Sequence, residues 1–380
     1  MFKRTLSILL VLVLSFSLLA GCGNEASEKP EENPKAEATA NTDDGNTDDE
    51  KFKVGFIYVG PIGDGGWTYS HNEGRLYLEE ELGVETIYRE SVPEDQKVEK
   101  VMKDMIDQGA KVIFATSFGY MDYVEKVSKE FPEVKFLHCS GYKTTENMSN
   151  YFGRIYEARY LSGIVAGMKT ESNKIGYVAA YSIPEVVRGI NAFTLGVQSV
   201  NPDAKVAVRW THTWYDPAKE KEAAKALLDE GADVIAQHQD TAGPQQAAEE
   251  AGAFAVGYNT NSYEQAPKAF MTAPIWNWGP YYVEQVKAAM DGNWESHSYW
   301  GGLKDGIVKL APITENAPEG AQEKVDEVKE KILNGELNVF GGPIKNQDGE
   351  IVVKEGEALS DSEMLSIEWF VEGVEGKIEK

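Results

Sequence analysis

The sequence is poor in the residue types that hold metals, form disulfides or carry out covalent chemistry. It contains two cysteines, Cys22 and Cys139, and five histidines in 380 residues. The histidines lack metal-ligand spacing, and no G-x-S-x-G, H-E-x-x-H or C-x-x-C motif occurs. We therefore expect no catalytic centre, no metal site and no cofactor.

Positive charge is also scarce. The formal net charge is −25 at pH 7, and no basic stripe is present that would meet nucleic-acid phosphates. The same acidity disfavours a broad electrostatic attraction to anionic lipid headgroups. Nucleic acid is therefore excluded as an expected partner.

Long apolar runs are absent except at the N-terminus. Lys3 and Arg4 precede an apolar stretch over residues 6–19, which is short for a membrane span and typical of a signal peptide. The tetrapeptide LAGC, ending at Cys22, follows at once and resembles a bacterial lipobox. The resemblance implies removal of residues 1–21 and attachment of acyl chains such as palmitate to Cys22, which would anchor the protein to the extracytoplasmic face of the membrane. The alternative is an ordinary signal peptide with an incidental cysteine.

The segment after the lipobox cannot form a core. Residues 23–50 are mainly Glu, Asp, Asn, Thr, Ala and Pro, with almost no large apolar side chain. Such a composition predicts a disordered tether between the lipidated Cys22 and the folded body. Cys139 ends the apolar run KFLHC, where we expect it to be a small buried hydrophobe without a disulfide partner in the mature chain.

A glycine-rich loop near residue 60 predicts the position of a binding cleft. An apolar run over residues 54–59 reads as a buried strand, five residues of glycine and proline follow within 60–66, and Trp67 opens a helical pattern. Ligands of open α/β sheets bind outside the carboxyl ends of the strands. The loop carries Asp64 instead of a lysine and lacks the Walker pattern, so we do not expect a phosphate. The aromatic face of Trp67 suits a flat, neutral ligand such as a base or a sugar. The alternative is that Trp67 only packs under the first helix.

The rest of the body alternates apolar runs with amphipathic stretches, which predicts two α/β halves with parallel sheets. In the first half we expect strands at 54–59, 84–89, 111–115 and 134–139, and in the second half at 174–180, 205–211, 234–237 and 254–258. After residue 259 the chain is expected to cross back to the first half, with short strands at 269–273 and 307–310. Residues 344–353 predict a β-hairpin, and the element type over 360–380 stays open.

Several long segments resemble one family of binding proteins. They include GRIYEARYLSGIVAG, KIGYVAAYSIPEVVRGINAFTLGVQSVNP and YWGGLKDGIVKLAP, and the resemblance covers roughly residues 52–376. The sequence is similar to the basic membrane protein (Bmp/Med) family of substrate-binding lipoproteins for ABC importers. This resemblance implies a type I periplasmic-binding-protein fold, with two doubly wound parallel-sheet lobes, a hinge of three crossovers and a ligand enclosed on closure. Lobe 1 is then expected over residues 51–155 plus roughly 260–310, and lobe 2 over 156–259 plus roughly 311–380.

Family members that resemble purine nucleoside receptors suggest the ligand class. Their opening loop has the form Asp-Lys-Ser-Phe-Asn, and here Asp64 and Trp67 stand at its polar and aromatic positions. A second aromatic position of the family falls on Trp214. The resemblance therefore implies that Trp67 and Trp214, one from each lobe, enclose a flat ring.

Two departures from that pattern bear on ligand size. Asn259 stands where nucleoside binders carry an aspartate that holds the ribose, and Trp276 stands in the region of a lysine. Their effect would be a smaller and drier pocket, so our hypothesis is a free nucleobase such as adenine instead of a nucleoside. Asp240 and Glu157 are the expected acceptors for an exocyclic amine or a ring N–H.

Three further residues, Phe118, Tyr120 and Tyr156, complete the candidate site. Phe118 and Tyr120 lie in a strand-to-helix loop that is expected to face the cleft, where ligand contact is the favoured interpretation. Tyr156 and Glu157 open the segment after the first crossover, and they either contact the ligand or only cap a hinge helix.

We therefore expect a monomeric capture lipoprotein that closes on a purine-type ligand and delivers it to an ABC permease and its ATPase. The alternatives are a ligand-sensing lipoprotein without transport and a receptor for another aromatic heterocycle such as riboflavin. His238 and Asp240 flank a strand end and could suggest acid–base chemistry, but a polar lining of a cleft fits better. An enzyme such as a nucleoside hydrolase would need clustered aspartates and a metal, which the sequence does not offer.

Overall fold

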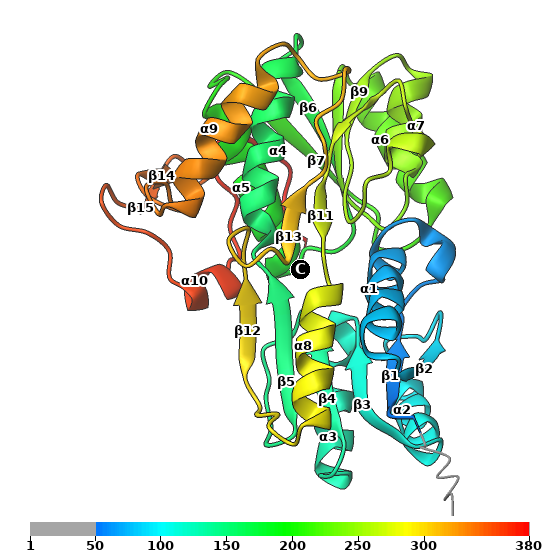
Figure 1. The fold of residues 1–380 in the computed structure, drawn as a ribbon. Helices are drawn as coiled ribbons and strands as arrows, with labels where there is room; N and C mark the ends of the chain where they lie inside the picture. Colours follow the sequence, from blue (N-terminus) through cyan, green and yellow to red (C-terminus); the bar gives the residue numbers. More distant parts are fainter. Residues whose placement is uncertain (1–50, 380) are drawn as a thin grey trace, which may run out of the picture. The chain divides into compact units, whose positions relative to one another are not determined.

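Two six-stranded parallel sheets form the folded body, which the computed structural model describes over residues 51–379 (Figure 1). The strand order is β12-β5-β4-β3-β1-β2 in the first sheet and β10-β9-β8-β6-β7-β16 in the second. Helices cover both sheets, so each sheet and its helices make one lobe, and the expected fold class is confirmed. The expected signal peptide, Cys22 and the acidic tether lie outside the described residues.

Lobe 1 is built from three β–α repeats, two further strands and a late return of the chain. Its elements are β1 (Lys53–Ile57), α1 (Trp67–Leu82), β2 (Glu85–Arg89), α2 (Lys97–Asp107), β3 (Ala110–Ala115), α3 (Met121–Glu130), β4 (Lys135–Cys139), β5 (Met148–Gly153), α8 (Gly279–Met290) and β12 (Ser298–Gly301). Helix α2 shows why the local pattern folds this way. Val98, Met102 and Met105 recur at helical spacing and are all buried, so one face of α2 packs on the sheet.

Lobe 2 repeats the same plan and adds an irregular C-terminal part. Its elements are α4 (Ile155–Lys169), β6 (Lys174–Ala179), α5 (Pro184–Gln198), β7 (Lys205–Trp210), α6 (Pro217–Asp229), β8 (Val234–His238), α7 (Gly243–Glu250), β9 (Phe254–Val256), β10 (Phe270–Thr272), α9 (Ala321–Leu333), β14 (Ile344–Lys345), β15 (Ile351–Val353), α10 (Asp361–Leu365) and β16 (Val374–Glu375). Helices α5 and α6 begin at Pro184 and Pro217. Proline is tolerated there because the first backbone N–H groups of a helix have no intrahelical partner. The expected hairpin is present as β14 and β15.

Three segments join the lobes. The chain passes from β5 to α4, from β10 through β11 (Pro274–Trp276) to α8, and from β12 to β13 (Val308–Leu310). Strands β11 and β13 pair antiparallel between the two sheets. Strand β10 pairs with β9, so the segment up to residue 272 belongs with the second sheet, whereas we expected the return to lobe 1 near residue 260. The local pattern could not show this, because β10 is only three residues long and its pattern does not distinguish a strand of the second sheet from one of the first.

Strand β5 was not expected from the sequence. All six of its residues are buried, yet Ser149 and Asn150 interrupt the apolar run that marks a buried strand. The structure explains how these polar side chains are tolerated. The Ser149 hydroxyl accepts the backbone N–H of His297 at 2.9 Å, and the Asn150 amide donates to the Ser298 hydroxyl at 2.8 Å. Hydrogen-bond partners in and near β12, almost 150 residues later in the chain, therefore satisfy the polar side chains of β5.

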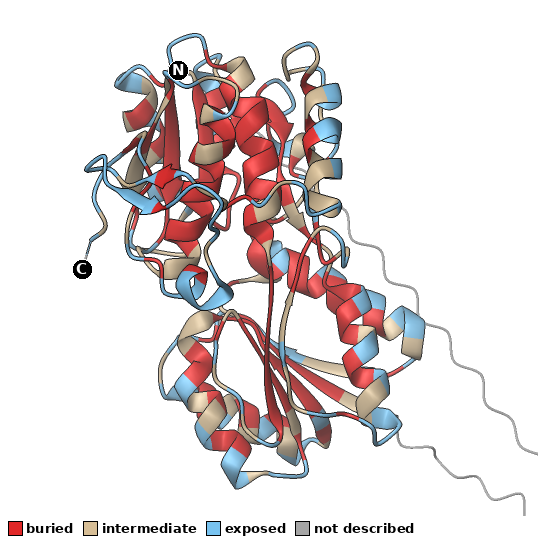
Figure 2. Ribbon diagram, turned by 90° about the vertical axis from the view of Figure 1, so that its left-hand side faces the viewer, coloured by how far each residue is buried: buried red, intermediate tan, exposed pale blue. Residues whose placement is uncertain are grey.

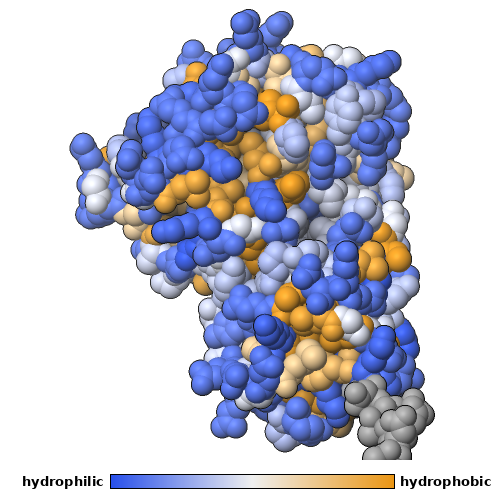
Figure 3. Space-filling view, viewed as in Figure 1, coloured by the Kyte–Doolittle hydropathy of each residue, from blue (hydrophilic) through white to orange (hydrophobic). Residues whose placement is uncertain are grey.

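Buried residues concentrate in the strands of both sheets and in helices α4 and α5 (Figure 2). Cys139 is fully buried at the end of β4, as expected, and burial raises the pKa of its thiol well above the usual value. The outer surface is different. Hydrophilic side chains cover most of the face shown in Figure 3, and apolar side chains gather in a few patches, one of them over α8. Among the described residues, no helix has the length and apolar character needed to cross a bilayer.

Candidate functional site

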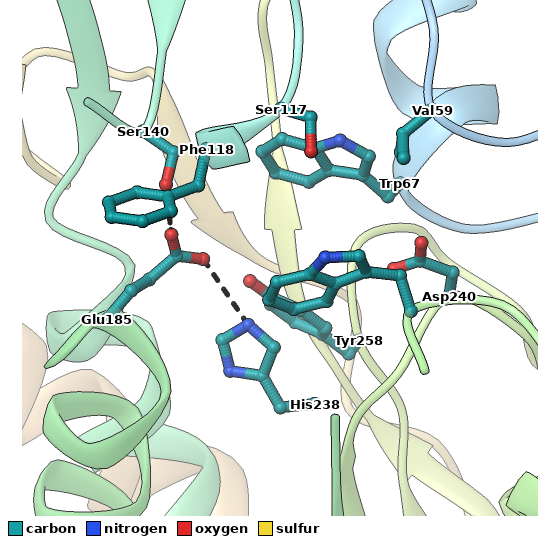
Figure 4. A pocket seen from close by; sticks show the side chains of 10 residues that line it. Val59, Trp67, Ser117, Phe118, Ser140, Glu185, His238, Asp240 and Tyr258 are labelled. Carbon is teal, nitrogen blue, oxygen red and sulfur yellow. Dashed lines mark hydrogen bonds and ion pairs between the residues drawn. The ribbon is translucent and has the colours of Figure 1, made fainter. Parts of the chain in front are cut away.

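A cavity lies between the lobes, where the carboxyl ends of strands from both sheets come together (Figure 4). Several lining residues follow a strand directly: Val59 comes after β1, Ser117 after β3, Ser140 after β4 and Tyr258 after β9. This is the edge of an open parallel sheet at which ligands bind. The full lining is Val59, Trp67, Ser117, Phe118, Ser140, Glu185, Trp214, His238, Asp240 and Tyr258.

Trp67 forms a rigid wall on the lobe 1 side. Its side chain is 8% exposed, and its indole N–H donates to the carbonyl of Thr116 at 2.8 Å. Its ring meets His71, Trp276 and Trp278 edge to face, with ring centroids 4.3 to 5.9 Å apart. These contacts fix the ring before any ligand arrives, which lowers the entropic cost of using it as a stacking surface.

Trp214 faces the cavity from lobe 2 and is held less firmly. It is half-buried in the loop between β7 and α6, and its ring lies 5.1 Å from that of Tyr181 and 6.4 Å from that of His238, centroid to centroid. The two tryptophans belong to different lobes. A ring that contacted both would therefore stabilise the closed arrangement of the lobes.

Asp240 is the polar group of the cavity that most needs a partner. It is 5% exposed, and its Oδ2 atom has no hydrogen-bond partner among the described residues. Burial raises the pKa of this carboxyl well above its usual value, and the nearby carboxylates of Asp64, Glu220 and Glu185 raise it further. A buried carboxyl without a partner is unfavourable, so a ligand that donates a hydrogen bond would remove the penalty.

The raised pKa of Asp240 predicts how stability depends on pH. The folded protein holds this proton more tightly than the unfolded chain, so the cost of ionising Asp240 is absent in acid and grows as pH rises through its folded-state pKa. We expect Asp240→Asn, without ligand, to unfold at a higher temperature than the unmodified protein at pH 8, by about 2–4 °C for each kcal/mol relieved. The difference should shrink towards pH 4. Calorimetric melting across this range checks it.

The matched control for this prediction is Asp203→Asn, which changes an exposed aspartate of the same lobe. It should melt with the unmodified protein at every pH. If Asp240→Asn melts no higher than the unmodified protein at pH 8, then Asp240 carries no ionisation penalty in the folded state, and the prediction is wrong.

Glu185, Ser140 and His238 form a hydrogen-bonded group on the other side of the cavity (Figure 4). The Ser140 hydroxyl donates to Glu185 Oε2, and His238 Nε2 lies 3.4 Å from Glu185 Oε1. Burial lowers the pKa of His238 to about 4, although the Glu185 carboxylate opposes the shift, so the imidazole is neutral at pH 7. Ser140 comes from lobe 1 while Glu185 and His238 come from lobe 2, so this group also bridges the lobes.

The loop before α1 makes a second bridge between the lobes. The Thr260 hydroxyl donates to the carbonyl of Gly65 at 2.6 Å. A β-carbon placed on Gly66 would lie 2.1 Å from the Asp240 carbonyl oxygen, so the two backbones approach as closely as only glycine allows. Asp64 stabilises this loop, since its carboxylate accepts the backbone N–H groups of Gly66, Thr68 and Tyr69 at 2.8 to 2.9 Å. Burial nevertheless raises the pKa of Asp64 to about 6.

The structure brings four of the ten predicted site residues to the cavity lining, namely Trp67, Phe118, Trp214 and Asp240. The other six do not line it: Asp64, Tyr120, Tyr156, Glu157, Asn259 and Trp276. The Asp64 carboxylate already accepts backbone N–H groups at the start of α1, as described above. Tyr120 is fully buried in the lobe 1 core, where its hydroxyl donates to the carbonyl of Val92 at 2.5 Å.

Tyr156 and Glu157 lie near the hinge, away from the cavity. The ring of Tyr156 packs against Trp300 and Phe340, with centroids 5.9 and 5.5 Å away. The Glu157 carboxylate accepts the backbone N–H of Leu303 at 2.7 Å. Of the two roles left open for this pair, the structural one at the hinge therefore matches their contacts.

Asn259 and Trp276 hydrogen-bond to each other behind the cavity. The Trp276 indole N–H donates to the Asn259 side-chain oxygen at 2.9 Å, and both residues are buried. Trp276 also stacks on Trp278, with ring centroids 4.4 Å apart. The two departures from the nucleoside-receptor pattern are thus one mutually satisfied pair, and their effect on the cavity is indirect, through Trp67.

This pair should stabilise the fold more than it selects the ligand. We expect Trp276→Phe to lower the free energy of unfolding by about 1–3 kcal/mol, because it leaves the Asn259 oxygen buried without its donor. The ratio of the dissociation constants for a nucleobase and its nucleoside should stay within about threefold, since the change lies outside the lining. Chemical denaturation and calorimetric titration measure the two quantities. A large change in that ratio with unchanged stability would contradict this assignment.

Six lining residues were not among the predicted ligand contacts: Val59, Ser117, Ser140, Glu185, His238 and Tyr258. His238 was expected only as a polar lining beside Asp240. Five of them lie at or just after strand ends, which was the available signal, because residues at that edge of a parallel sheet face the binding crevice. Glu185 lies in the first turn of α5 and carries no such signal. Among the described residues, no group of three or more His, Cys, Asp or Glu side chains is arranged to hold a metal ion.

Comparison with known proteins identifies the family. The sequence model for ABC transporter substrate-binding proteins of the PnrA-like type, Bmp, matches residues 51–341. The chain belongs to the Bmp family. This Bmp-family protein is therefore the extracytoplasmic substrate-binding component of an ABC transporter and not an enzyme. That role implies a small-molecule ligand and a permease partner.

Two curated relatives of this Bmp-family protein are similar over most of their length. A purine-binding protein of Brucella abortus is 47% identical over 332 residues, which span 87% of this chain and 95% of the relative. A putative ABC transporter glucose-binding protein of Haloferax volcanii is 41% identical over 336 residues, spanning 88% and 83%. Among solved structures, an ABC transporter solute-binding protein from Aeropyrum pernix has a TM-score of 0.67 at 23% identity, covering 78% of this chain and 93% of that one, and shares the fold.

Proposed function

We propose that this Bmp-family protein captures a purine, with a free nucleobase such as adenine preferred over a nucleoside, and delivers it to an ABC permease. The observation that carries the proposal is the cavity between Trp67 and Trp214. Aromatic faces stack on nucleobases with a contribution of about 1–3 kcal/mol per base. The 47% identical relative from Brucella abortus is named as purine-binding, which supports the same ligand class.

The polar groups of the cavity also suit a purine. Asp240 offers an acceptor to an exocyclic amine or a ring N–H, and its neutral form can also donate to a ring nitrogen. A sugar would need polar partners around its whole rim. The lining contributes only two serine hydroxyls, one tyrosine hydroxyl, one histidine and two carboxyl groups beside four apolar side chains, Val59, Trp67, Phe118 and Trp214. This composition favours a purine over the glucose named for the relative from Haloferax volcanii.

Calorimetric titration of residues 51–380 tests the proposal. The protein is unfolded to strip carried ligand, refolded, and titrated with adenine, adenosine, hypoxanthine, guanosine, riboflavin and glucose. We expect tight one-to-one binding of adenine and much weaker binding of adenosine. Equal affinity for adenine and adenosine would overturn the nucleobase preference, and tight binding of glucose or riboflavin without adenine would overturn the purine assignment.

Transport by a lipid-anchored monomer is part of the same proposal. The support for the anchor is the lipobox ending at Cys22, and the support for transport is membership of the family. Intact mass spectrometry of protein extracted from membranes should show a chain that begins at acylated Cys22. Loss of labelled adenine uptake on deletion of the gene would support transport, whereas unchanged uptake would favour the sensing role.

A further inference from the structure

Glu185 is a buried carboxylate held ready on the cavity wall. It lies in the first turn of α5, and its side chain is 12% exposed. Burial would raise its pKa, but the hydrogen bonds from His238 and Ser140 and the positive charge of Arg188 outweigh burial, so the pKa is lowered. A carboxylate has about four lone-pair directions, and these neighbours use two of them. Glu185 can therefore accept a further hydrogen bond.

Glu185 and Asp240 lie on opposite sides of the cavity. Figure 4 shows Glu185 beside Ser140 and Phe118 at one side, Asp240 at the other, and the ring of Trp67 above the space between them. A flat ring stacked on Trp67 would thus present one edge to Asp240 and the opposite edge to Glu185. In adenine, the amine of the six-membered ring and the N–H of the five-membered ring stand at opposite ends of the molecule.

A second cavity lies directly behind Glu185. Phe118, Ser140 and Glu185 line both cavities. Arg188, Tyr142 and Leu365 are among its other lining residues. The side chains shared by the two cavities are therefore the wall between them, and the hydrogen bond from Ser140 to Glu185 closes that wall.

We propose that Glu185 is the specificity-determining residue that distinguishes a free purine base from its nucleoside, by accepting the ring N–H that only the free base carries. This inference rests on the proposed function. Glu185, and not Asn259 or Trp276, is then the cause of the preference for a nucleobase over a nucleoside. Ser140 and His238 are positioning residues, because they orient the Glu185 carboxylate and do not need to touch the ligand.

Two effects act together against a nucleoside. Substitution at the five-membered ring removes the N–H, so the buried Glu185 carboxylate loses its donor, and the sugar must displace the wall shared by the two cavities. Sites built to hydrogen-bond a ligand N–H reject analogues lacking it by about 10⁴- to 10⁵-fold at the upper end. We expect adenine to bind at least about 100-fold more tightly than 9-methyladenine, which lacks the N–H but adds only a methyl group.

The test is the ratio of the dissociation constants for 9-methyladenine and adenine, measured calorimetrically on the stripped protein and on Glu185→Ala. The variant should bind adenine more weakly, and the ratio should fall to about tenfold or less, because it lacks the acceptor and opens the wall. Ser140→Ala should give an intermediate ratio. Glu171→Ala, which changes an exposed glutamate of the same lobe, should leave the ratio unchanged.

The outcomes separate this inference from the proposed function. If the unmodified protein does not bind adenine, the proposed function fails and the inference fails with it. If it binds adenine and 9-methyladenine equally, or if Glu185→Ala weakens both equally, the purine assignment stands and the role of Glu185 is overturned. A purely structural role for Glu185 would produce the second pattern, since it would not alter the ratio. Should Glu185→Ala not fold, Glu185→Gln, which nearly preserves the shape, provides the same ratio, with partial loss expected.

Discussion

Replacing Trp214 with alanine is expected to weaken adenine binding by about 10- to 100-fold while the protein stays folded. Stacking of a nucleobase on one aromatic side chain contributes about 1–3 kcal/mol, and Trp214 is the stacking surface that lobe 2 offers. The side chain is half-buried and contacts few core residues, so its loss should change the free energy of unfolding by only about 1 kcal/mol. Calorimetric titration and thermal melting measure the two quantities.

The same change in Trp67 should behave differently, which makes the comparison informative. Trp67 is buried, hydrogen-bonded and packed against four other aromatic rings. Trp67→Ala is therefore expected to remove binding and also to lower the free energy of unfolding by about 3–5 kcal/mol. Binding loss without stability loss should be found only for Trp214.

The matched control is Trp210→Ala. Trp210 is another half-buried tryptophan of lobe 2, but it stacks on Phe370 outside the cavity and donates to the carbonyl of Lys377 at 2.8 Å. Its removal should leave adenine affinity within about threefold. If Trp214→Ala keeps full affinity, or if Trp210→Ala loses as much, the aromatic sandwich is not the source of binding.

Much of the fold was predictable because its patterns are local. Runs such as KVGFI and the helical spacing of Val98, Met102 and Met105 are read within one element, and these elements are present in the structure. Strand β5 and the sheet to which β10 belongs were not predictable in this way. The polar residues of β5 are satisfied by partners in and near β12, which lie far along the chain. Strand β10 pairs with β9, which is close in sequence, but its three-residue pattern does not show to which sheet it belongs.

The site residues also differ in whether the local sequence could reveal them. Trp67, Phe118, Trp214 and Asp240 stand after strands in segments that mark a loop, and the sequence sufficed to select them as candidates. Glu185 was not selected, because its role depends on Ser140, which is 45 residues away and in the other lobe. Asn259 and Trp276 were selected although they do not line the cavity. Nothing local in the sequence shows that their side chains hydrogen-bond to each other instead. Contacts between lobes are therefore where sequence reasoning is weakest.

Closure of the lobes can be tested by a substitution at Gly66. In the structure, a β-carbon on Gly66 would lie 2.1 Å from the carbonyl oxygen and 2.8 Å from the carbonyl carbon of Asp240. These are backbone atoms of the opposite lobe, next to the acceptor of the cavity, and they cannot rotate away as a flexible side chain would. Gly66→Ala should therefore prevent the lobes from reaching this arrangement while leaving each lobe folded.

The expected result is a loss of at least about 100-fold in adenine affinity, because a penalty of about 3 kcal/mol on the closed state reduces apparent binding by that factor. Small-angle scattering should show that adenine makes the unmodified protein more compact and leaves Gly66→Ala unchanged. Gly63→Ala is the control in the same loop, since a β-carbon there would meet nothing within 4 Å. Tight binding by Gly66→Ala would mean that the ligand is held without this contact, and closure would then have to be assigned to the bridge between Ser140 and Glu185.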